Sequence, residues 1–388
     1  MKNTLGGGMF KHLNPGQIKF CLLLVLAVSL PFSESVKSIA LFLLLAVFIF
    51  QIYRKEIEFN ITVIHIAFAG MMISAFISSM FAENIAKGLK GFYDITYCSI
   101  AFLVAASLAD EKQTRIILWG LYISAAAAAV IGIVHAIQNN GAIEIHQLRN
   151  PNYIAMYLII VLCSMVSTIV LSDRETVSSR IMLGMLAVIV LAASVMTQYR
   201  SSFIGLFLLI FLLIFAKRNI KYSLITGISL GSIGLLAIFM YKPLWNKITT
   251  TQSLTARFYL WEGAIDYFKT SPLLGIGPNH YSFLHPAGSP TAGGTNIDAH
   301  SIYLNTLAQT GLFGFVALLM IVYGFAREFF KSKLSSDFVL SVKYGALGAF
   351  LVTFAGGIFD TTLHHAHGIV FGLLSGLFMA HSAKESVR

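Results

Sequence analysis

Long apolar stretches separated by short polar segments dominate the pattern of this chain. A helix needs about 20 apolar residues to cross a membrane, and twelve segments approach or reach that length. We expect helices at 18–32, 36–53, 60–81, 91–108, 116–137, 153–171, 181–199, 201–216, 222–240, 301–325, 338–358 and 369–382. The pattern predicts an all-α, polytopic membrane protein of about 12 transmembrane helices, with residues 1–388 forming a single integral membrane domain.

The division between 181–199 and 201–216 rests on length. Residues 181–216 form one apolar run that only the polar segment 197–202 interrupts. A single helix of that size would be roughly 50 Å long at about 1.5 Å per residue, which exceeds a hydrocarbon core of about 30 Å. The chain therefore has to turn here, and Arg200 lies at the turn.

The largest polar interruption covers residues 241–300. Within it, apolar side chains recur at the spacing of one helix face, at Leu254, Phe258, Trp261, Ile265 and Phe268,. Pro272 ends this helix. We expect one large periplasmic loop that contains an interfacial helix. Gly275 and Gly277 predict a tight turn that holds this helix against the next element.

Composition and charge fix the class and the orientation. The chain is 57% hydrophobic and 11% charged, with a mean hydropathy of +0.78. If the N-terminus is cytoplasmic, the inner segments hold 18 of the 27 Lys and Arg residues, so the positive-inside rule places both termini in the cytoplasm. This distribution explains the net charge of +10 without nucleic acid. Residues 241–300 and the turn 360–367 then face outward.

Three ionisable side chains on the external face are candidates for chemistry. Arg200 and Arg257 could bind a phosphate or diphosphate, because a guanidinium presents a planar fork to such oxygens. As alternatives, Arg200 reaches the lipid head groups and Arg257 pairs with Glu262. His300 opens an apolar helix, where an imidazole can serve as a general base. A capping or packing role for His300 stays open at this point.

Asp360, His364, His365 and His367 share one external turn and raise the question of a metal site. Their spacing matches no ligand pattern that we can justify, so we expect no metal there. Asn152, in the loop before residue 153, is explained equally well as a helix cap. The three cysteines lie inside apolar runs, which indicates packing rather than disulfides or zinc.

Several short motifs carry a family resemblance. In chain order they are Asn150-Pro151-Asn152-Tyr153, Thr197-Gln198-Tyr199-Arg200-Ser201-Ser202, Arg257 followed by Trp261-Glu262-Gly263-Ala264, Pro272-Leu273-Leu274-Gly275-Ile276-Gly277, Ala299-His300-Ser301-Ile302-Tyr303-Leu304 and Gly311-Leu312-Phe313-Gly314. Together they resemble the O-antigen ligase/polymerase family of bacterial membrane glycosyltransferases. Tyr199 departs from the family's Thr-x-Ser-Arg segment, in which a serine precedes the arginine.

The resemblance implies a GT-C-like enzyme of the bacterial inner membrane that works at the periplasmic face, among membrane lipids. It implies metal-independent, inverting transfer of a glycan from undecaprenyl diphosphate to the lipid A-core, without a cofactor. Carried onto this chain, His300 deprotonates the acceptor hydroxyl while Arg200 and Arg257 hold the diphosphate. Substrate contacts are expected at Arg149, Asn152, Tyr199, His280 and Tyr281.

Two alternatives stay open. A polymerase of the same family would use a second lipid-linked glycan as its acceptor. A flippase for lipid-linked sugars, from another class, should place charges in several spans, whereas the predicted spans are nearly free of ionisable residues. No pattern in the sequence indicates an oligomeric state.

Overall fold

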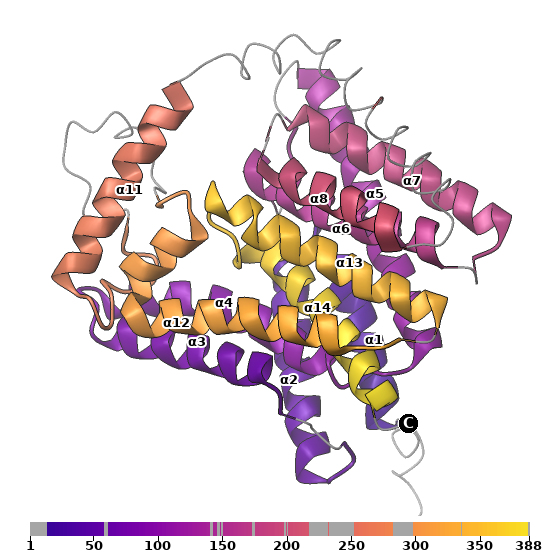
Figure 1. Ribbon diagram of the computed structural model, residues 1–388, viewed down its shortest axis with the longest axis horizontal. Helices are drawn as coiled ribbons and strands as arrows, with labels where there is room; N and C mark the ends of the chain where they lie inside the picture. The colour runs from indigo at the N-terminus through magenta and orange to yellow at the C-terminus, as the bar shows by residue number, and fades with distance from the viewer. Residues whose placement is uncertain are drawn as a thin grey trace, which may run out of the picture.

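The computed structural model describes residues 14–386 apart from 58–60, 140–142, 146–147, 149, 173–174, 198, 200, 217–231, 233–251, 282–297 and 335. These residues form helices and no strand. The helices are α1 (Pro15–Ser29), α2 (Glu34–Tyr53), α3 (Val63–Met80), α4 (Ile85–Ala105), α5 (Glu111–Asn139), α6 (Pro151–Leu171), α7 (Val177–Met196), α8 (Ser201–Ala216), α11 (Gln252–Thr270), α12 (Ile302–Lys331), α13 (Asp337–Phe354), the short 3₁₀ helix η2 (Gly356–Ile358) and α14 (His365–Ser386) (Figure 1).

The predicted all-α architecture is confirmed for the described residues. Each predicted segment contains a helix except 222–240, of which only residue 232 is described. Eight of the helices are long and apolar enough to cross a membrane. The helices before and after the predicted turn end at Met196 and begin at Ser201. Several helices extend beyond their predicted bounds. Thus α12 ends at Lys331, and α4 begins at Ile85 rather than six residues later, because the side chain of Asn84 caps its N-terminus,.

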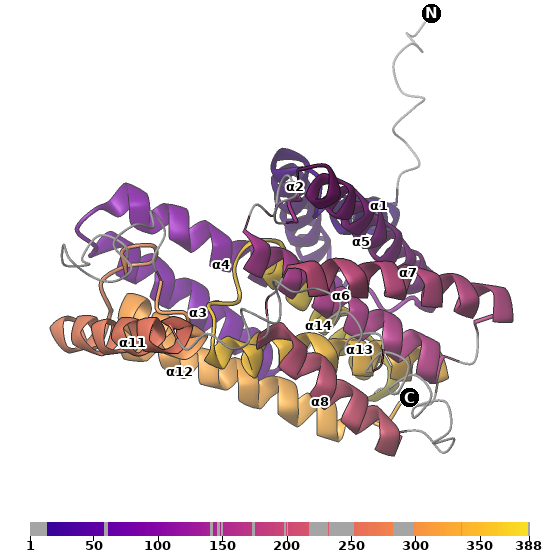
Figure 2. The same ribbon diagram turned by 90° about the horizontal axis from the view of Figure 1, so that it is seen from above.

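The centre of the bundle is formed by α6 and α14 (Figure 2). Their spanning stretches are 94% and 89% buried, so other helices rather than lipid surround them. Glycines allow α14 to approach α4 closely. A Cβ atom on Gly372 would lie 2.4 Å from the carbonyl oxygen of Cys98, and one on Gly376 would lie 2.4 Å from that of Phe102. Small residues four positions apart are typical of tight helix pairs in membranes.

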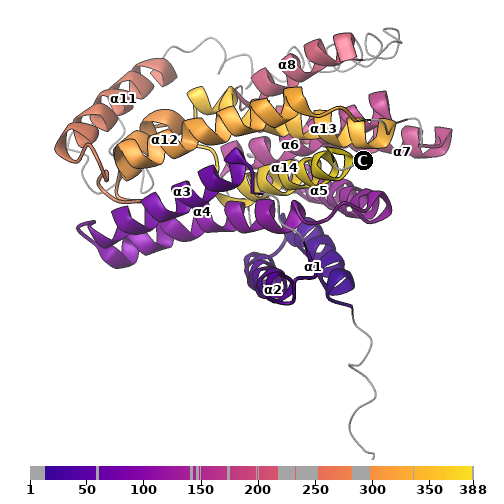
Figure 3. The same ribbon diagram turned by 60° about the horizontal axis from the view of Figure 1, so that its bottom comes forward.

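Helix α11 lies at one end of the molecule against α12, while α1 and α2 pack together on another side of the bundle (Figure 3). Helix α11 buries Leu260 and Ala264 in an apolar cluster with Ala308 of α12. Phe258 and Ile265, from the apolar stripe predicted for this helix, are 63% and 43% exposed. The stripe therefore faces away from the protein, which is the orientation that an interfacial helix requires.

Glycines in the turn after α11 and at a kink in α12 allow these two segments to pack closely against each other. Gly311 has a φ of 64° inside α12, and a Cβ atom there would lie 2.3 Å from the carbonyl oxygen of Leu273. In the turn after α11, a Cβ atom on Gly275 would lie 2.4 Å from the carbonyl carbon of Gln309. The amide of Gly277 donates to the carbonyl oxygen of Gln309 at 3.0 Å. The turn expected to hold α11 against the next element is thus confirmed.

Candidate active site

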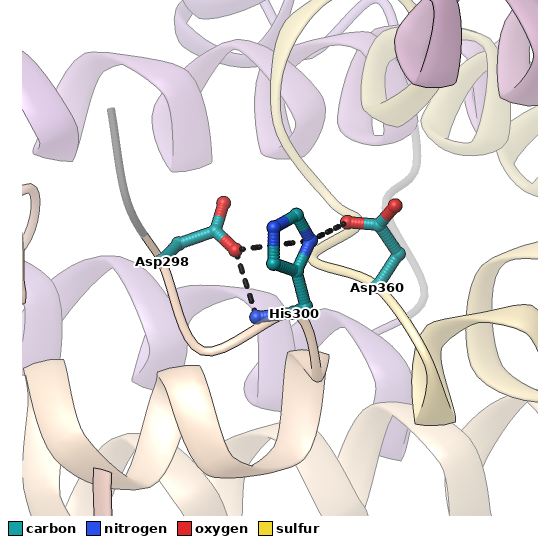
Figure 4. A group of neighbouring side chains, drawn as sticks. All are labelled: Asp298, His300 and Asp360. Atoms are coloured by element: carbon teal, nitrogen blue, oxygen red, sulfur yellow. Dashed lines mark hydrogen bonds and ion pairs between the residues drawn. The ribbon is translucent and has the colours of Figure 1, made fainter. Parts of the chain in front are cut away.

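Two loops bring a histidine and an aspartate together beside the start of α12. His300 precedes the N-cap residue Ser301, as predicted for a residue at a helix start, and Asp360 lies between η2 and α14. His300 Nδ1 is 3.1 Å from Asp360 Oδ1, a hydrogen-bond distance (Figure 4). Because an ionised carboxylate can only accept, Nδ1–H is the donor. The lone pair that a base needs then lies on Nε2.

Asp298 flanks the imidazole of His300 on its other side (Figure 4). Its Oδ1 accepts the backbone amide of His300 at 2.8 Å and lies 3.7 Å from Nδ1. In this turn His300 has a φ of 43°, a left-handed conformation that residues other than glycine rarely adopt. Strained backbone of this kind is found at functional sites, where the surroundings hold it. Asp298 therefore fixes the backbone of His300, and Asp360 fixes its ring.

Asp360 is only 1% exposed and receives hydrogen bonds from distant parts of the chain. Its Oδ2 accepts from Asn152 Nδ2 at 3.2 Å, and its Oδ1 accepts from the backbone amide of Thr361 at 2.7 Å. The hydroxyl of Tyr199 also lowers the pKa of Asp360. Asn152, expected as a substrate contact, thus reaches the histidine through Asp360, and direct substrate contacts at Asn152 and Tyr199 stay predictions.

The position of Asn152 corrects one alternative from the sequence. The cap of α6 is Asn150, whose side chain accepts a hydrogen bond from the backbone amide of Asn152. The side chain of Asn152 is therefore not needed as a cap and is available to donate to Asp360. Asn150 thus caps α6, while the hydrogen bond from Asn152 to Asp360 connects the start of α6 to the loop before α14.

Burial and charge set the protonation of this group. Burial raises the pKa of Asp360, but its hydrogen bond to His300 and the charge of His300 outweigh burial, so the pKa lies below its usual range. For Asp298 burial dominates and raises the pKa of the carboxyl group. Burial lowers the pKa of His300, yet the hydrogen bond to Asp360 and the charges of both aspartates raise it above its ordinary value. His300 is therefore a stronger base than a free imidazole.

Arg257 acts on the same group from α11. It shares a helix face with Leu260 and Ala264, three and seven residues further on, and these two side chains are buried toward the protein,. Its positive charge lowers the pKa of His300, so the guanidinium lies within electrostatic range of the imidazole. Arg200 and Arg149 lie outside the described residues. Of the three residues proposed for catalysis, His300 and Arg257 are described, and the charge of Arg257 acts on His300.

Known sequences match the part of the chain that supplies these side chains. Residues 185–319 match the family model described as O-antigen ligase. This match supports the expected relationship to the O-antigen ligase/polymerase family. Arg200, Arg257 and His300 all fall inside the matched segment, whereas Asn152 and Asp360 lie outside it.

A relative from Haemophilus influenzae, described as an uncharacterized protein, is 29% identical over 163 residues. The match covers 36% of this chain and 41% of the relative. The chain thus spans about two fifths of the relative's length.

His280 and Tyr281 anchor the turn after α11. His280 is 2% exposed; its Nε2 accepts from the amide of Asn84 at 3.1 Å and its Nδ1 donates to the carbonyl oxygen of Pro278 at 3.0 Å. Tyr281 is buried, and its hydroxyl donates to the carbonyl oxygen of Leu260. These bonds tie the turn to α4 and α11. Direct substrate contacts at both residues stay predictions.

The histidines of the 360–367 turn do not group with Asp360. The rings of His364 and His365 each lie 4.8 Å from the ring of Tyr153. His365 Nδ1 is 3.7 Å from a carboxylate oxygen of Asp94, and His365 adopts a φ of 52°. Burial lowers the pKa of His364 well below its usual range. The structure thus separates this cluster from the carboxylate with which the sequence had associated it.

A cation could be held by Asp298, His300 and Asp360, whose ligand atoms lie within 4.8 Å of one another. A metal bound there would have to displace the hydrogen bond between His300 Nδ1 and Asp360 Oδ1. It would also compete with the donors from Asn152 and the Thr361 amide, which already occupy the Asp360 oxygens. These donors fit an oriented base better than a metal centre.

Proposed function

We propose that the protein is an O-antigen ligase that transfers a glycan from undecaprenyl diphosphate to a sugar hydroxyl of the lipid A-core. The observation that carries this proposal is the bond from His300 Nδ1 to the buried Asp360, beside the positive charge of Arg257. The family match supports the reaction class, because members of the family are glycosyltransferase-like enzymes.

In the proposed reaction, Nε2 of His300 takes the proton of the acceptor hydroxyl. The hydroxyl oxygen forms a bond to the anomeric carbon of the donor as the bond from that carbon to the diphosphate oxygen breaks. The electron pair leaves with the diphosphate, and the configuration at the anomeric carbon inverts. Asp360 keeps the proton of Nδ1 in place and stabilises the imidazolium that forms.

The leaving group determines what the arginines do. Charge grows on the diphosphate as the glycosidic bond breaks, and cations placed at that position stabilise the transition state. Arg257 supplies one such cation, and we assign the same role to Arg200. The fork of a guanidinium matches two oxygens of a phosphate at once, which a lysine cannot do. One base and two arginines are then sufficient for a single displacement.

The membrane arrangement follows the distribution of Lys and Arg. We propose about twelve spans in the bacterial inner membrane, with both termini cytoplasmic and residues 241–300 in the periplasm. The outward-facing apolar stripe of α11, at Phe258 and Ile265, supports a position at the interface, where the diphosphate of a lipid donor resides. Arg257, on the other side of this helix, would meet the diphosphate at head-group depth.

The experiment is glycan transfer by purified protein reconstituted in lipid, with undecaprenyl-diphosphate glycan as the donor. Replacing His300 by alanine should lower transfer about 10²- to 10⁴-fold, the usual contribution of a general base, and leave donor binding intact. Arg257→Lys should also fail because the fork is lost. His135→Ala, which changes a histidine near the C-terminal end of α5, is the matched control. Full activity of His300→Ala would refute the proposal.

The same assay separates a ligase from a polymerase. A product that forms only when lipid A-core is added indicates a ligase. Longer lipid-linked chains in the absence of lipid A-core would indicate a polymerase that uses the same base. Movement of the donor across the bilayer without any new glycosidic bond would instead support a flippase.

A further inference from the structure

A cavity of about 270 Å³ lies next to the catalytic group. Its walls come from α4, α12, the turn after α11 and the loop before α14. Polar side chains in these walls include Lys90, Asp94, Asn305, Thr306, Gln309 and Thr361. The volume is close to the lower end of small-molecule sites, about 300 Å³. A site of this size suits one sugar ring rather than a polymer.

Several polar groups on the cavity wall have hydrogen-bonding capacity that the described residues do not use. Asn305 accepts at Oδ1 from the amide of Ala299 and from Gln309 Nε2, but its amide nitrogen donates to none of them. Thr306 is 9% exposed, and its hydroxyl likewise meets no hydrogen-bond partner among them. Asp94 keeps 35% of its side chain exposed and lies 3.7 Å from His365, with the charge of Lys90 also acting on it. Amide, hydroxyl and carboxylate groups that meet in one cavity wall can form hydrogen bonds to a polar ligand.

The cavity is continuous with the surroundings of the base. Asp298 lines the cavity and also accepts the backbone amide of His300. Thr361 lines the cavity and donates its amide to Asp360. Neither His300 nor Arg257 is among the lining residues. The cavity borders the histidine through its neighbours Asp298 and Thr361, and the charge of Arg257 acts on His300 from α11.

The charges of the cavity decide which substrate suits it. Two carboxylates, from Asp94 and Asp298, and one amine, from Lys90, line it. This combination disfavours a diphosphate, which carries several negative charges. Amide N–H groups, hydroxyls and carboxylates together match the alternating donors and acceptors of a sugar ring. Tyr153 also lines the wall, with its ring packed against the rings of His364 and His365.

We propose that this cavity binds the acceptor sugar, the ring whose hydroxyl gives its proton to His300. The inference rests on the proposed glycosyltransferase function and adds to it a position for the acceptor. The donor diphosphate then lies on the Arg257 side, and the reacting atoms meet at the imidazole. Asp94, Asn305 and Thr306 determine which sugar is accepted.

The test is steady-state transfer by the full-length protein, with undecaprenyl-diphosphate glycan and lipid A-core varied separately. Asp94→Asn and Thr306→Val keep the size of each side chain. We expect the KM for lipid A-core to rise about 10-fold or more for Asp94→Asn and about 2- to 10-fold for Thr306→Val, with the KM for the donor unchanged. Matched controls are Asp266→Asn, exposed on α11, and Thr96→Val, whose hydroxyl bonds within α4.

A rise in the donor KM instead of the acceptor KM, or no change in either, would overturn the assignment of the cavity. A protection measurement covers the case in which a variant does not fold. In a Cys21→Ser background, Thr306→Cys should react with a maleimide that enters the cavity. The labelling then reports on position 306, because the remaining cysteines, Cys98 and Cys163, are buried. Lipid A-core should slow this reaction and the donor alone should not; the reverse result also overturns the proposal.

The two proposals fail separately. Full transfer by His300→Ala removes the base but leaves the acceptor KM values of the cavity variants informative. Unchanged acceptor KM values in Asp94→Asn and Thr306→Val, together with an inactive His300→Ala, remove the cavity and keep the enzyme. If the chain proves to be a polymerase, the same KM shifts should appear for the second lipid-linked glycan.

Discussion

Replacing Asp360 by asparagine tests the hydrogen-bonded pair of His300 and Asp360 with the smallest change in shape. The 3.1 Å bond from His300 Nδ1 then has a neutral acceptor, and the imidazolium loses its counter-charge. If the new amide keeps its oxygen toward His300, its NH₂ group faces Asn152 Nδ2, which lies 3.2 Å from the present Oδ2. Two donors then oppose each other until the Asn152 amide rotates, so the side chains can relieve the conflict without moving the backbone.

The expected loss follows from the change in that one bond. Hydrogen bonds to charged groups contribute about 1.5–3 kcal/mol and neutral ones about 0.5–1.5 kcal/mol. The difference of about 1–1.5 kcal/mol corresponds to roughly a tenfold decrease in kcat. The pKa of His300 also falls when the carboxylate is lost, which weakens the base further. We therefore expect kcat to fall about 10- to 100-fold, less than for His300→Ala.

The assay is single-turnover transfer at saturating donor and acceptor, so that binding does not limit the rate. Asp266→Asn is the control for loss of an exposed carboxylate. Asn152→Ala is an independent test, because it removes one donor to Asp360 and leaves the carboxylate in place; its kcat should fall less than that of Asp360→Asn. Wild-type kcat in Asp360→Asn, or a change confined to KM, would refute the argued role.

Other predictions use the remaining charges and contacts. Because the base must be neutral and its pKa is raised, kcat/KM should rise with pH. Asp298→Asn should move this rise to lower pH, because Asp298 raises the pKa of His300, and Arg257→Gln should move it to higher pH, because Arg257 lowers that pKa. Shifts of both variants in the same direction would contradict the assignment. Gly311→Ala, with φ of 64° and backbone atoms at 2.3 Å, should destabilise the protein by about 1–3 kcal/mol in thermal unfolding, whereas Gly184→Ala, with no atom within 4 Å, should not. A chelator should leave transfer unchanged, and recovery of lost activity on adding a divalent cation would instead make Asp298, His300 and Asp360 a metal site.

The helices could be predicted because the bilayer imposes one simple requirement. An apolar run of about 20 residues has to be helical to satisfy its backbone in lipid, so position and length follow from hydrophobicity alone. The turn before Ser201 followed from length in the same way. The start of α4 did not, because it depends on a single cap, the side chain of Asn84. Lys87 and Lys90 lie in the first two turns of α4, so a pattern based on hydrophobicity places the start of the helix after them.

The contacts of Asp298 and Asp360 with His300 could not be predicted, because loop geometry pairs residues that the sequence pattern does not connect. Asp360 is 60 positions from His300, and in the sequence it stands beside three histidines that suggested a metal site. Asp298 is two residues from His300, but nothing in the pattern shows that the turn directs its carboxylate back to the backbone amide. The useful signal was Asn152: two asparagines flank Pro151, and a helix needs only one of them as a cap.

On the proposed assignment, the charges around His300 keep the two substrates at different positions. Carboxylates from Asp94 and Asp298 line the cavity together with one amine, from Lys90, and the charge of Arg257 acts from α11. A diphosphate that entered the cavity would meet two carboxylates and a single lysine among the lining residues, whereas a neutral sugar could form hydrogen bonds there. Exchanging the two substrates would therefore be unfavourable at both positions, which is how the electrostatics of the proposed site would distinguish the donor of the glycan from its acceptor.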